Sequence, residues 1–76
     1  MELSPDGKVD LRGLRCPFTL LELGKALKTL KGGGLIEITS DHESIIDELQ
    51  IWCTGTGVEF VASAVEDDIK VYLRKP

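Results

Sequence analysis

The sequence predicts an α/β fold, more closely an α+β two-layer sandwich in which two helices cover one face of a four-stranded mixed sheet. Two segments place apolar residues three or four positions apart and end at glycines, which is typical of amphipathic helices. Four shorter segments alternate apolar and polar residues, which is typical of strands with one buried face. These segments follow one another in the order β-α-β-α-β-β, so both helices are expected on the same side of the sheet.

The first half of the chain holds a strand, a helix and a second strand. Alternation over residues 8–11 predicts the first strand, which Gly13 ends. Helical spacing over residues 17–31 predicts a core stripe made of Leu20, Leu23, Ala26, Leu27 and Leu30. Gly24 lies within this helix at a cost of about 1 kcal/mol relative to alanine, for which a closely packed neighbouring element is one explanation. Residues 35–39 form the second strand.

The second half holds a helix and a predicted β-hairpin. Ser40 or Asp41 is expected as the N-cap of a helix over residues 43–53. The buried face of that helix comprises Ile45, Ile46, Leu49, Trp52 and Cys53. Residues 58–64 and 69–74 alternate and pair as the hairpin. In the first of these strands the face expected to point inward comprises Val58, Phe60, Ala62 and Ala64.

Size and composition indicate one small domain over residues 1–76, with an ordered core at about residues 8–75. The start of the chain is polar and acidic, unlike a signal peptide, and no apolar run approaches the roughly 20 residues that span a bilayer. We therefore expect a cytoplasmic protein without a membrane partner. The chain has a net charge of −4, whereas a protein that binds nucleic acid tightly carries an excess of Lys and Arg on its binding surface.

The charge is unevenly distributed along the chain. Residues 1–31 hold six Lys or Arg against four Asp or Glu, a net charge of +2. Residues 32–76 hold three against nine, a net charge of −6. A protein partner with an acidic docking surface fits the positive half. Two cysteines and one histidine, without a Cys/His cluster, predict neither a metal site nor a bound cofactor.

Cys16 is the strongest candidate for chemistry. Pro17 suits the first helical position, which makes Cys16 the expected N-cap of the first helix. The positive end of the helix dipole and hydrogen bonds from the N–H groups of Phe18 and Thr19 favour the thiolate, which is the reactive form. The competing interpretation is a small buried residue that happens to precede a helix.

Several neighbours of this thiol extend the candidate site. Arg12 and Arg15 contribute positive charge, and Asp10 is placed to hydrogen-bond the turn. Phe18 and Leu21 fall outside the core stripe on a helical wheel. They predict either a docking patch around the thiol or ordinary exposed apolar residues.

The remaining residues limit the reaction classes. His42 lies at the start of the second helix, where a solvated role is expected, so the chain shows no base for a cysteine hydrolase. A thiol activated only by its helix suits disulfide or persulfide exchange. Cys53 is expected to be buried, with a disulfide to Cys16 or a relay role as the alternatives.

Residues 10–17, Asp-Leu-Arg-Gly-Leu-Arg-Cys-Pro, resemble the D-x-x-G-L-x-C-P signature of the TusA/SirA-like sulfur carrier family. The resemblance runs from Lys8 to Lys75 and includes the Trp52-Cys53 pair. It implies a persulfide carried on Cys16, and a site shaped by Asp10, Gly13, Leu14 and Pro17. It also implies a carrier in a sulfur relay, not a classical turnover enzyme.

The resemblance also implies protein partners, and the sequence departs from the family pattern at one position. A cysteine desulfurase or rhodanese-like protein would donate sulfur, and an acceptor protein would take it for tRNA thiolation, molybdenum cofactor synthesis or sulfur oxidation. The family usually reads C-P-x-P, whereas Thr19 stands at the second proline here and offers a hydroxyl near the sulfur.

Three other function classes remain open at this stage. A non-catalytic regulatory or interaction module would have an ordinary thiol pKa at Cys16. A redox switch would form a Cys16–Cys53 disulfide. An RNA-binding domain would use the open face of the sheet, but Tyr72 is the one aromatic residue among those expected there, which are Glu59, Val61, Lys70, Tyr72 and Arg74.

Overall fold

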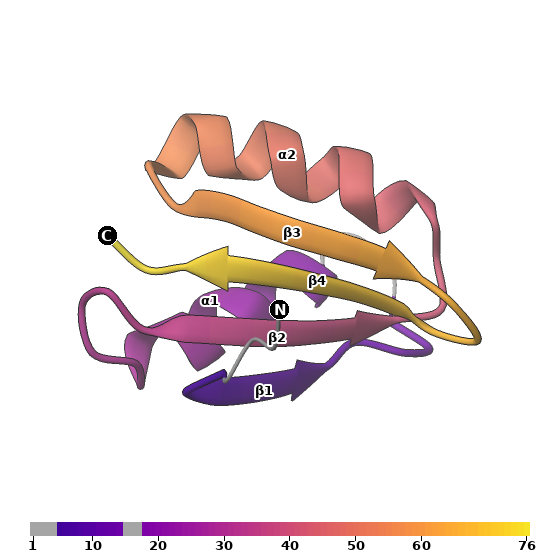
Figure 1. Cartoon of the computed structure of the whole chain (residues 1–76), viewed down its shortest axis with the longest axis horizontal. Coiled ribbons are helices and arrows are strands. Elements are labelled where there is room, and N and C mark those ends of the chain that lie inside the picture. The colour runs from indigo at the N-terminus through magenta and orange to yellow at the C-terminus, as the bar shows by residue number, and fades with distance from the viewer. Residues whose placement is uncertain (1–4, 15–17) are drawn as a thin grey trace.

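The computed structural model describes residues 5–14 and 18–76 and shows the predicted order of elements (Figure 1). The strands are β1 (Gly7–Asp10), β2 (Leu35–Ser40), β3 (Glu59–Val65) and β4 (Ile69–Arg74). The helices are α1 (Phe18–Lys28) and α2 (Ser44–Thr56). The predicted two-layer α+β fold with a mixed sheet is confirmed.

The strand order β1-β2-β4-β3 brings the starts of both helices to one end of the sheet. β1 and β2 are parallel, so their carboxyl ends meet there, and α1 and α2 follow them in the chain. β4 runs antiparallel to β2 and begins opposite Ser40, which adds the β3–β4 turn to the same place. We call this the carboxyl end of the sheet, and its described loops are residues 11–14, 41–43 and 66–68.

Both helices pack on one face of the sheet around a single apolar core. α1 lies against β1 and α2 against β3. The fully buried core residues come from both helices and from the strands, and they include Leu11, Leu23, Ile36, Ile38, Ile45, Leu49, Val71 and Leu73. Each of these side chains is removed from water, which is the main driving force for the fold.

The predicted core stripe of α1 is confirmed, with one addition. Leu23 and Leu27 are buried, and Leu20, Ala26 and Leu30 are partly buried and pack against the core. Thr19, which the apolar pattern did not select, also takes a buried position. A Cβ at Gly24 would meet nothing within 4 Å, so close packing does not explain this glycine.

The start of α2 also differs from the prediction. The N-cap is Glu43, whose side chain makes no capping hydrogen bond, so neither Ser40 nor Asp41 caps the helix. Ser40 Oγ instead accepts a hydrogen bond from the His42 N–H at 3.2 Å. Asp41 Oδ2 accepts one from the Gly13 N–H at 3.2 Å. Both side chains hold loops at the carboxyl end of the sheet instead of a helix end.

The rest of α2 follows the prediction. Ile45, Leu49 and Cys53 are buried, and Ile46 and Trp52 pack half-buried against the core. The helix runs to Thr56, three residues beyond the predicted end. It stops at Gly57, whose φ of 81° is the left-handed conformation that glycine adopts readily at a helix C-terminus.

The predicted inward face of β3 is correct for Phe60 and wrong beyond it. Phe60 pairs with the buried Leu73, but a β-bulge follows, and the next paired residue is Ala62, opposite Tyr72. A bulge inserts one residue and so moves the following side chains to the other face. Ala62 and Ala64 therefore share the open face with Tyr72 and Lys70.

Candidate functional site

The candidate site lies at the start of α1, at the carboxyl end of the sheet. The predicted roles of Arg15, Cys16 and Pro17 fall outside the described residues, so the site is built from the residues on either side. Leu14 precedes this segment and is half-buried against the core. Phe18 follows it as the first residue of α1.

The loop that leads to the site is held by backbone hydrogen bonds. The Leu11 N–H donates to the Thr39 carbonyl oxygen at 2.7 Å, which continues the β1–β2 pairing by one residue. The Leu14 N–H donates back to the Leu11 carbonyl oxygen at 3.1 Å. Gly13 between them has a φ of 81°, a conformation that costs a side-chain-bearing residue strain.

Asp10 fixes the same loop through its carboxylate. Oδ1 accepts hydrogen bonds from the backbone N–H and from Nε of Arg12, each at 3.0 Å, and Oδ2 accepts one from Nη2 at 2.8 Å. These hydrogen bonds lower the pKa of Asp10 to about 2. The carboxylate thus hydrogen-bonds the turn as expected from the sequence, while its part in the chemistry stays a prediction.

Arg12 is exposed, and its charge is partly balanced. Besides Asp10, its Nη1 lies 3.5 Å from Oδ2 of Asp68 in the β3–β4 turn. The role expected of Arg12, positive charge beside the thiol, stays a prediction, and these two carboxylates reduce the net charge that it offers. Asp68 and Asp41 both touch this loop from distant parts of the chain, and no local pattern pointed to either contact.

The first turn of α1 presents two kinds of side chain. Phe18 and Leu21 are 61% and 58% exposed, on the side that the helical wheel assigned to them. Thr19 points into the molecule and is 3% exposed. Among the described residues its Oγ1 has no hydrogen-bond partner, which is costly for a buried hydroxyl.

A surface pocket of about 300 Å³ opens beside this turn. Leu14 and Thr19 form one wall. The other wall comes from the end of β2, the loop after it and the start of α2, and consists of Ser40, His42, Ser44, Ile45 and Glu48. His42 is thus half-buried in a pocket wall and not simply solvated. No local pattern in the sequence groups these residues, because only the parallel pairing of β1 and β2 brings the two helix starts together.

Cys53 lies in the last turns of α2, at the other end of the molecule from the candidate site. It is nine residues beyond Ser44, which corresponds to about 14 Å along the helix axis. Its side chain is buried, and this burial raises the pKa of the thiol. The predicted burial of Cys53 is confirmed.

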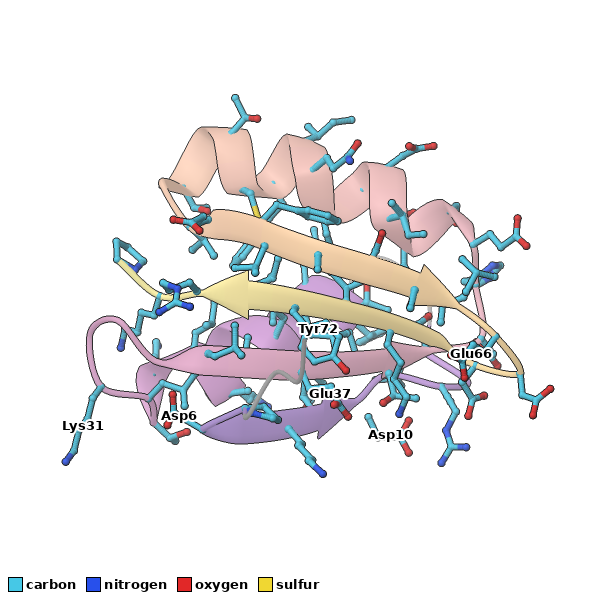
Figure 2. All side chains as sticks on the ribbon, in the orientation of Figure 1. Asp6, Asp10, Lys31, Glu37, Glu66 and Tyr72 are labelled. Carbon is cyan, nitrogen blue, oxygen red and sulfur yellow. The ribbon has the colours of Figure 1, made fainter. Side chains whose placement is uncertain are left out.

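The open face of the sheet is a network of paired polar groups. Figure 2 shows Tyr72 and Glu37 pointing toward one another, and the Tyr72 hydroxyl donates to Glu37 Oε2 at 3.0 Å. Lys70 Nζ donates to Thr39 Oγ1 at 3.0 Å and lies 3.6 Å from Glu37. Burial and the neighbouring Glu37 raise the pKa of Tyr72. RNA-binding sheet faces combine aromatic rings with free cations, whereas Glu37 here balances the charge of Lys70, which does not favour that function.

Two further observations hold for residues 5–14 and 18–76. No helix there is long and apolar enough to cross a membrane. Nowhere in those residues do three His, Cys, Asp or Glu side chains gather as a potential metal site.

Comparison with protein families matches residues 7–75 to the model described as "Sulfurtransferase TusA". A putative sulfur carrier protein of Archaeoglobus fulgidus is 37% identical over 60 residues, covering 79% of this chain and 82% of the relative. The putative sulfur carrier protein YrkF of Bacillus subtilis is 32% identical over 68 residues. That match covers 88% of this chain but only 37% of YrkF, so the chain spans little more than a third of that relative.

Among solved structures, the SirA-like protein of Desulfitobacterium hafniense superposes with a TM-score of 0.68. The alignment covers 90% of this chain and 95% of that one, at 24% sequence identity. The likeness shows that the two proteins share a fold.

Proposed function

The chain belongs to the TusA family, and on this premise we propose that it is a sulfur carrier that holds sulfane sulfur as a persulfide on Cys16. The observation that carries the proposal is the D-x-x-G-L-x-C-P signature, which ends in the sequence directly before α1. Relatives over most of the chain are named as putative sulfur carrier proteins, which supports the same role.

The chemistry requires two exchanges at one sulfur atom. In the first, the Cys16 thiolate attacks the outer sulfur of a donor persulfide, forming a new S–S bond while the donor leaves as a thiolate. In the second, an acceptor thiolate attacks the outer sulfur on Cys16, and Cys16 leaves as a thiolate. Both steps keep the number of S–S bonds constant and need neither an oxidant nor a general base.

The start of α1 supplies what both exchanges need. The N–H groups of its first turn have no acceptor within the helix, and the helix dipole is positive there. Both effects stabilise an anionic sulfur placed before Phe18, which lowers the thiol pKa. A lower pKa raises the thiolate fraction for the first exchange and makes Cys16 a better leaving group in the second.

The loop hydrogen bonds support this arrangement by fixing the residues before the thiol. Asp10 holds the Arg12 backbone, Asp41 holds the Gly13 N–H, and Leu14 is anchored in the core. A fixed loop reduces the conformational freedom that each transfer would otherwise have to remove. Asp10, Gly13, Leu14, Pro17 and Thr19 act in this proposal as site-shaping residues.

The partners are a sulfur donor, either a cysteine desulfurase or a rhodanese-like protein, and a sulfur-accepting protein, all in the cytoplasm. Phe18 and Leu21 form an exposed apolar pair on the first turns of α1, next to the carrier residue in sequence. Together with Arg12 and Arg15 they make the docking surface on which either partner would lie.

Intact-mass measurement after incubation with a cysteine desulfurase and cysteine, or with a rhodanese and thiosulfate, tests the proposal. The wild-type chain and Cys53→Ser should gain the mass of one sulfur atom, which a reducing agent removes. Cys16→Ser should gain none. A Cys16→Ser chain that still acquires reducible sulfur, or a wild-type chain that acquires none from either donor, would contradict the carrier function.

A further inference from the structure

The sulfur exchanges described above assign no role to the pocket between the helix starts. It lies between the first turn of α1 and the first turns of α2, with Leu14 and Thr19 on one side and Ser44, Ile45 and Glu48 on the other. Its volume of about 300 Å³ is large enough for the end of one long side chain. It is open to solvent beside the exposed Phe18.

Thr19 provides the first indication that the pocket takes a ligand. Its side chain lines the wall at 3% exposure, and among the described residues its hydroxyl has no hydrogen-bond partner. Buried polar groups in folded proteins are nearly always paired. A polar group entering the pocket would supply the missing partner.

The charge around the pocket indicates which polar group fits. Glu48 lines the wall and makes no ion pair among the described residues. Residues 41–48 contain four carboxylates and no Lys or Arg. Arg12 does not line the pocket and is bound to Asp10 and Asp68. A cation that enters the pocket would meet the carboxylate of Glu48.

The other polar groups of the wall favour a guanidinium over an ammonium ion. Ser44 and Thr19 offer hydroxyl oxygens, so hydrogen-bond acceptors stand on both sides of the pocket. Arginine carries five N–H donors in a planar fork and uses several acceptors at once, whereas lysine concentrates its charge at one point.

We propose that this pocket binds an arginine side chain of a protein partner, with Glu48 as its ion-pair partner and the Thr19 hydroxyl as a hydrogen-bond acceptor. A partner lying on Phe18 and Leu21 would place such a side chain within reach of the pocket. That this partner is the sulfur donor or acceptor rests on the proposed function, whereas the guanidinium site itself does not.

The test is a titration of the full chain with Nα-acetyl-arginine methylamide, followed by the backbone amide signals in NMR. The neutral citrulline analogue, which keeps the shape and loses the charge, is the matched ligand control. We expect saturable shifts grouped at Thr19, Ser44, Ile45 and Glu48 with the arginine compound and little response to the citrulline compound.

Variants then assign the binding to the named groups. Glu48→Gln should weaken binding on the order of tenfold, because a charge-assisted hydrogen bond is lost. Thr19→Val should weaken it severalfold. Glu59→Gln makes the same charge change at the start of β3 and should leave binding unchanged. Dispersed amide spectra of each variant show that it is folded.

Three results would overturn the proposal: no shifts at the pocket, equal binding of the citrulline compound, or equal affinity of Glu48→Gln and wild type. The same titration on Cys16→Ser separates this proposal from sulfur carriage. Arginine binding that persists in a chain unable to load sulfur leaves the pocket standing when the carrier function fails. Sulfur loading without arginine binding contradicts only the pocket.

Discussion

The start of α1 and the end of α2, where Cys53 lies, are opposite kinds of helix end. Cys16 precedes α1 in the sequence, and Cys53 lies in the last turns of α2. The first position offers unpaired N–H groups and the positive end of a dipole. The second offers the negative end and burial, which raises the pKa of the Cys53 thiol. Because the two helix ends shift a thiol pKa in opposite directions, we expect Cys16 and not Cys53 to exchange sulfur.

The chain segments next to these two helix ends also differ in the number of polar contacts that hold them. Polar side chains and hydrogen bonds from three loops meet at the carboxyl end of the sheet, where Asp10, Asp41 and Asp68 all contact residues 12–13. After Cys53 the chain simply ends its helix at Gly57 and enters β3. The contacts at the carboxyl end of the sheet fix a loop, whereas the residues around Cys53 complete the apolar core.

The largest expected difference is in thiol reactivity. In single-cysteine chains, Cys53→Ser and Cys16→Ser, iodoacetamide at neutral pH should modify Cys16 at least about tenfold faster than Cys53, because helix N-termini lower a thiol pKa and apolar burial raises it. Rates followed by mass spectrometry from pH 5 to 10 measure this. Equal rates throughout that range would contradict the comparison.

The pH dependence of the same reaction has a definite sign. The Cys53 rate should rise at higher pH than the Cys16 rate, because its pKa is raised above the ordinary 9.0. The folded state therefore holds the Cys53 proton more tightly than the unfolded chain does. Its contribution to stability is complete below the unfolded pKa and is lost as pH rises through the folded pKa.

The next effect concerns docking at the first turns of α1. Phe18→Ala and Leu21→Ala should slow sulfur transfer from a donor protein on the order of fivefold, as expected for truncated contact residues in an interface. Both side chains are mostly exposed, so stability should change by less than about 0.5 kcal/mol. Transfer is measured as initial loading rates at limiting carrier.

Ile51 provides the matched control for this prediction. It is 75% exposed and lies on α2, toward the Cys53 end. Ile51→Ala should alter neither stability nor loading. A loading defect in Ile51→Ala equal to that in Phe18→Ala would move the docking surface away from the carrier residue.

A smaller effect is the ionisation of Asp10. Its carboxyl signal in NMR should titrate with a midpoint of about 2, and in Arg12→Gln the midpoint should return toward the ordinary 3.8. Because the folded pKa is lowered, the stabilisation from this pair is complete above the ordinary pKa and is lost as pH falls through about 2. A wild-type midpoint near 4 would show that the Asp10–Arg12 contact does not hold the loop in solution.

The smallest effect concerns the helix that supports the site. A Cβ at Gly24 meets open space, so Gly24→Ala should stabilise the chain by up to about 1 kcal/mol through helix propensity alone. Urea unfolding measures this, and sulfur loading should stay at the wild-type level. Destabilisation would show that α1 needs the freedom of glycine at this position.

Most of the fold followed from the sequence because its signals are local. The spacing of leucines, the alternation of apolar and polar residues in the strands and the glycines at the helix ends predict the six elements and the buried faces of both helices. The β3 register was different: the bulge after Phe60 leaves Ala62 and Ala64 facing away from the core, and small alanines fit either face. Alternation alone therefore could not reveal the inserted residue.

The site was predictable only where it is contiguous in sequence. The run from Asp10 to Pro17 predicts the carrier residue, which stays a prediction, and the exposure that the helical wheel predicts for Phe18 and Leu21 is confirmed. The contacts of Asp41 and Asp68 depend on strand pairing, and so does the pocket that joins Thr19 to Glu48. Such contacts arise between segments far apart in the chain, so the sequence around one residue does not identify its contact partner.

The most direct test of the account is to locate the sulfur after loading. The wild-type chain is incubated with a desulfurase and cysteine, its persulfide is trapped by alkylation, and the peptides are analysed by mass spectrometry. We expect the additional sulfur on the peptide that contains Cys16 and none on the peptide that contains Cys53. Sulfur on Cys53, or a disulfide joining the two cysteines, would contradict the claim that the start of α1 is the carrier site.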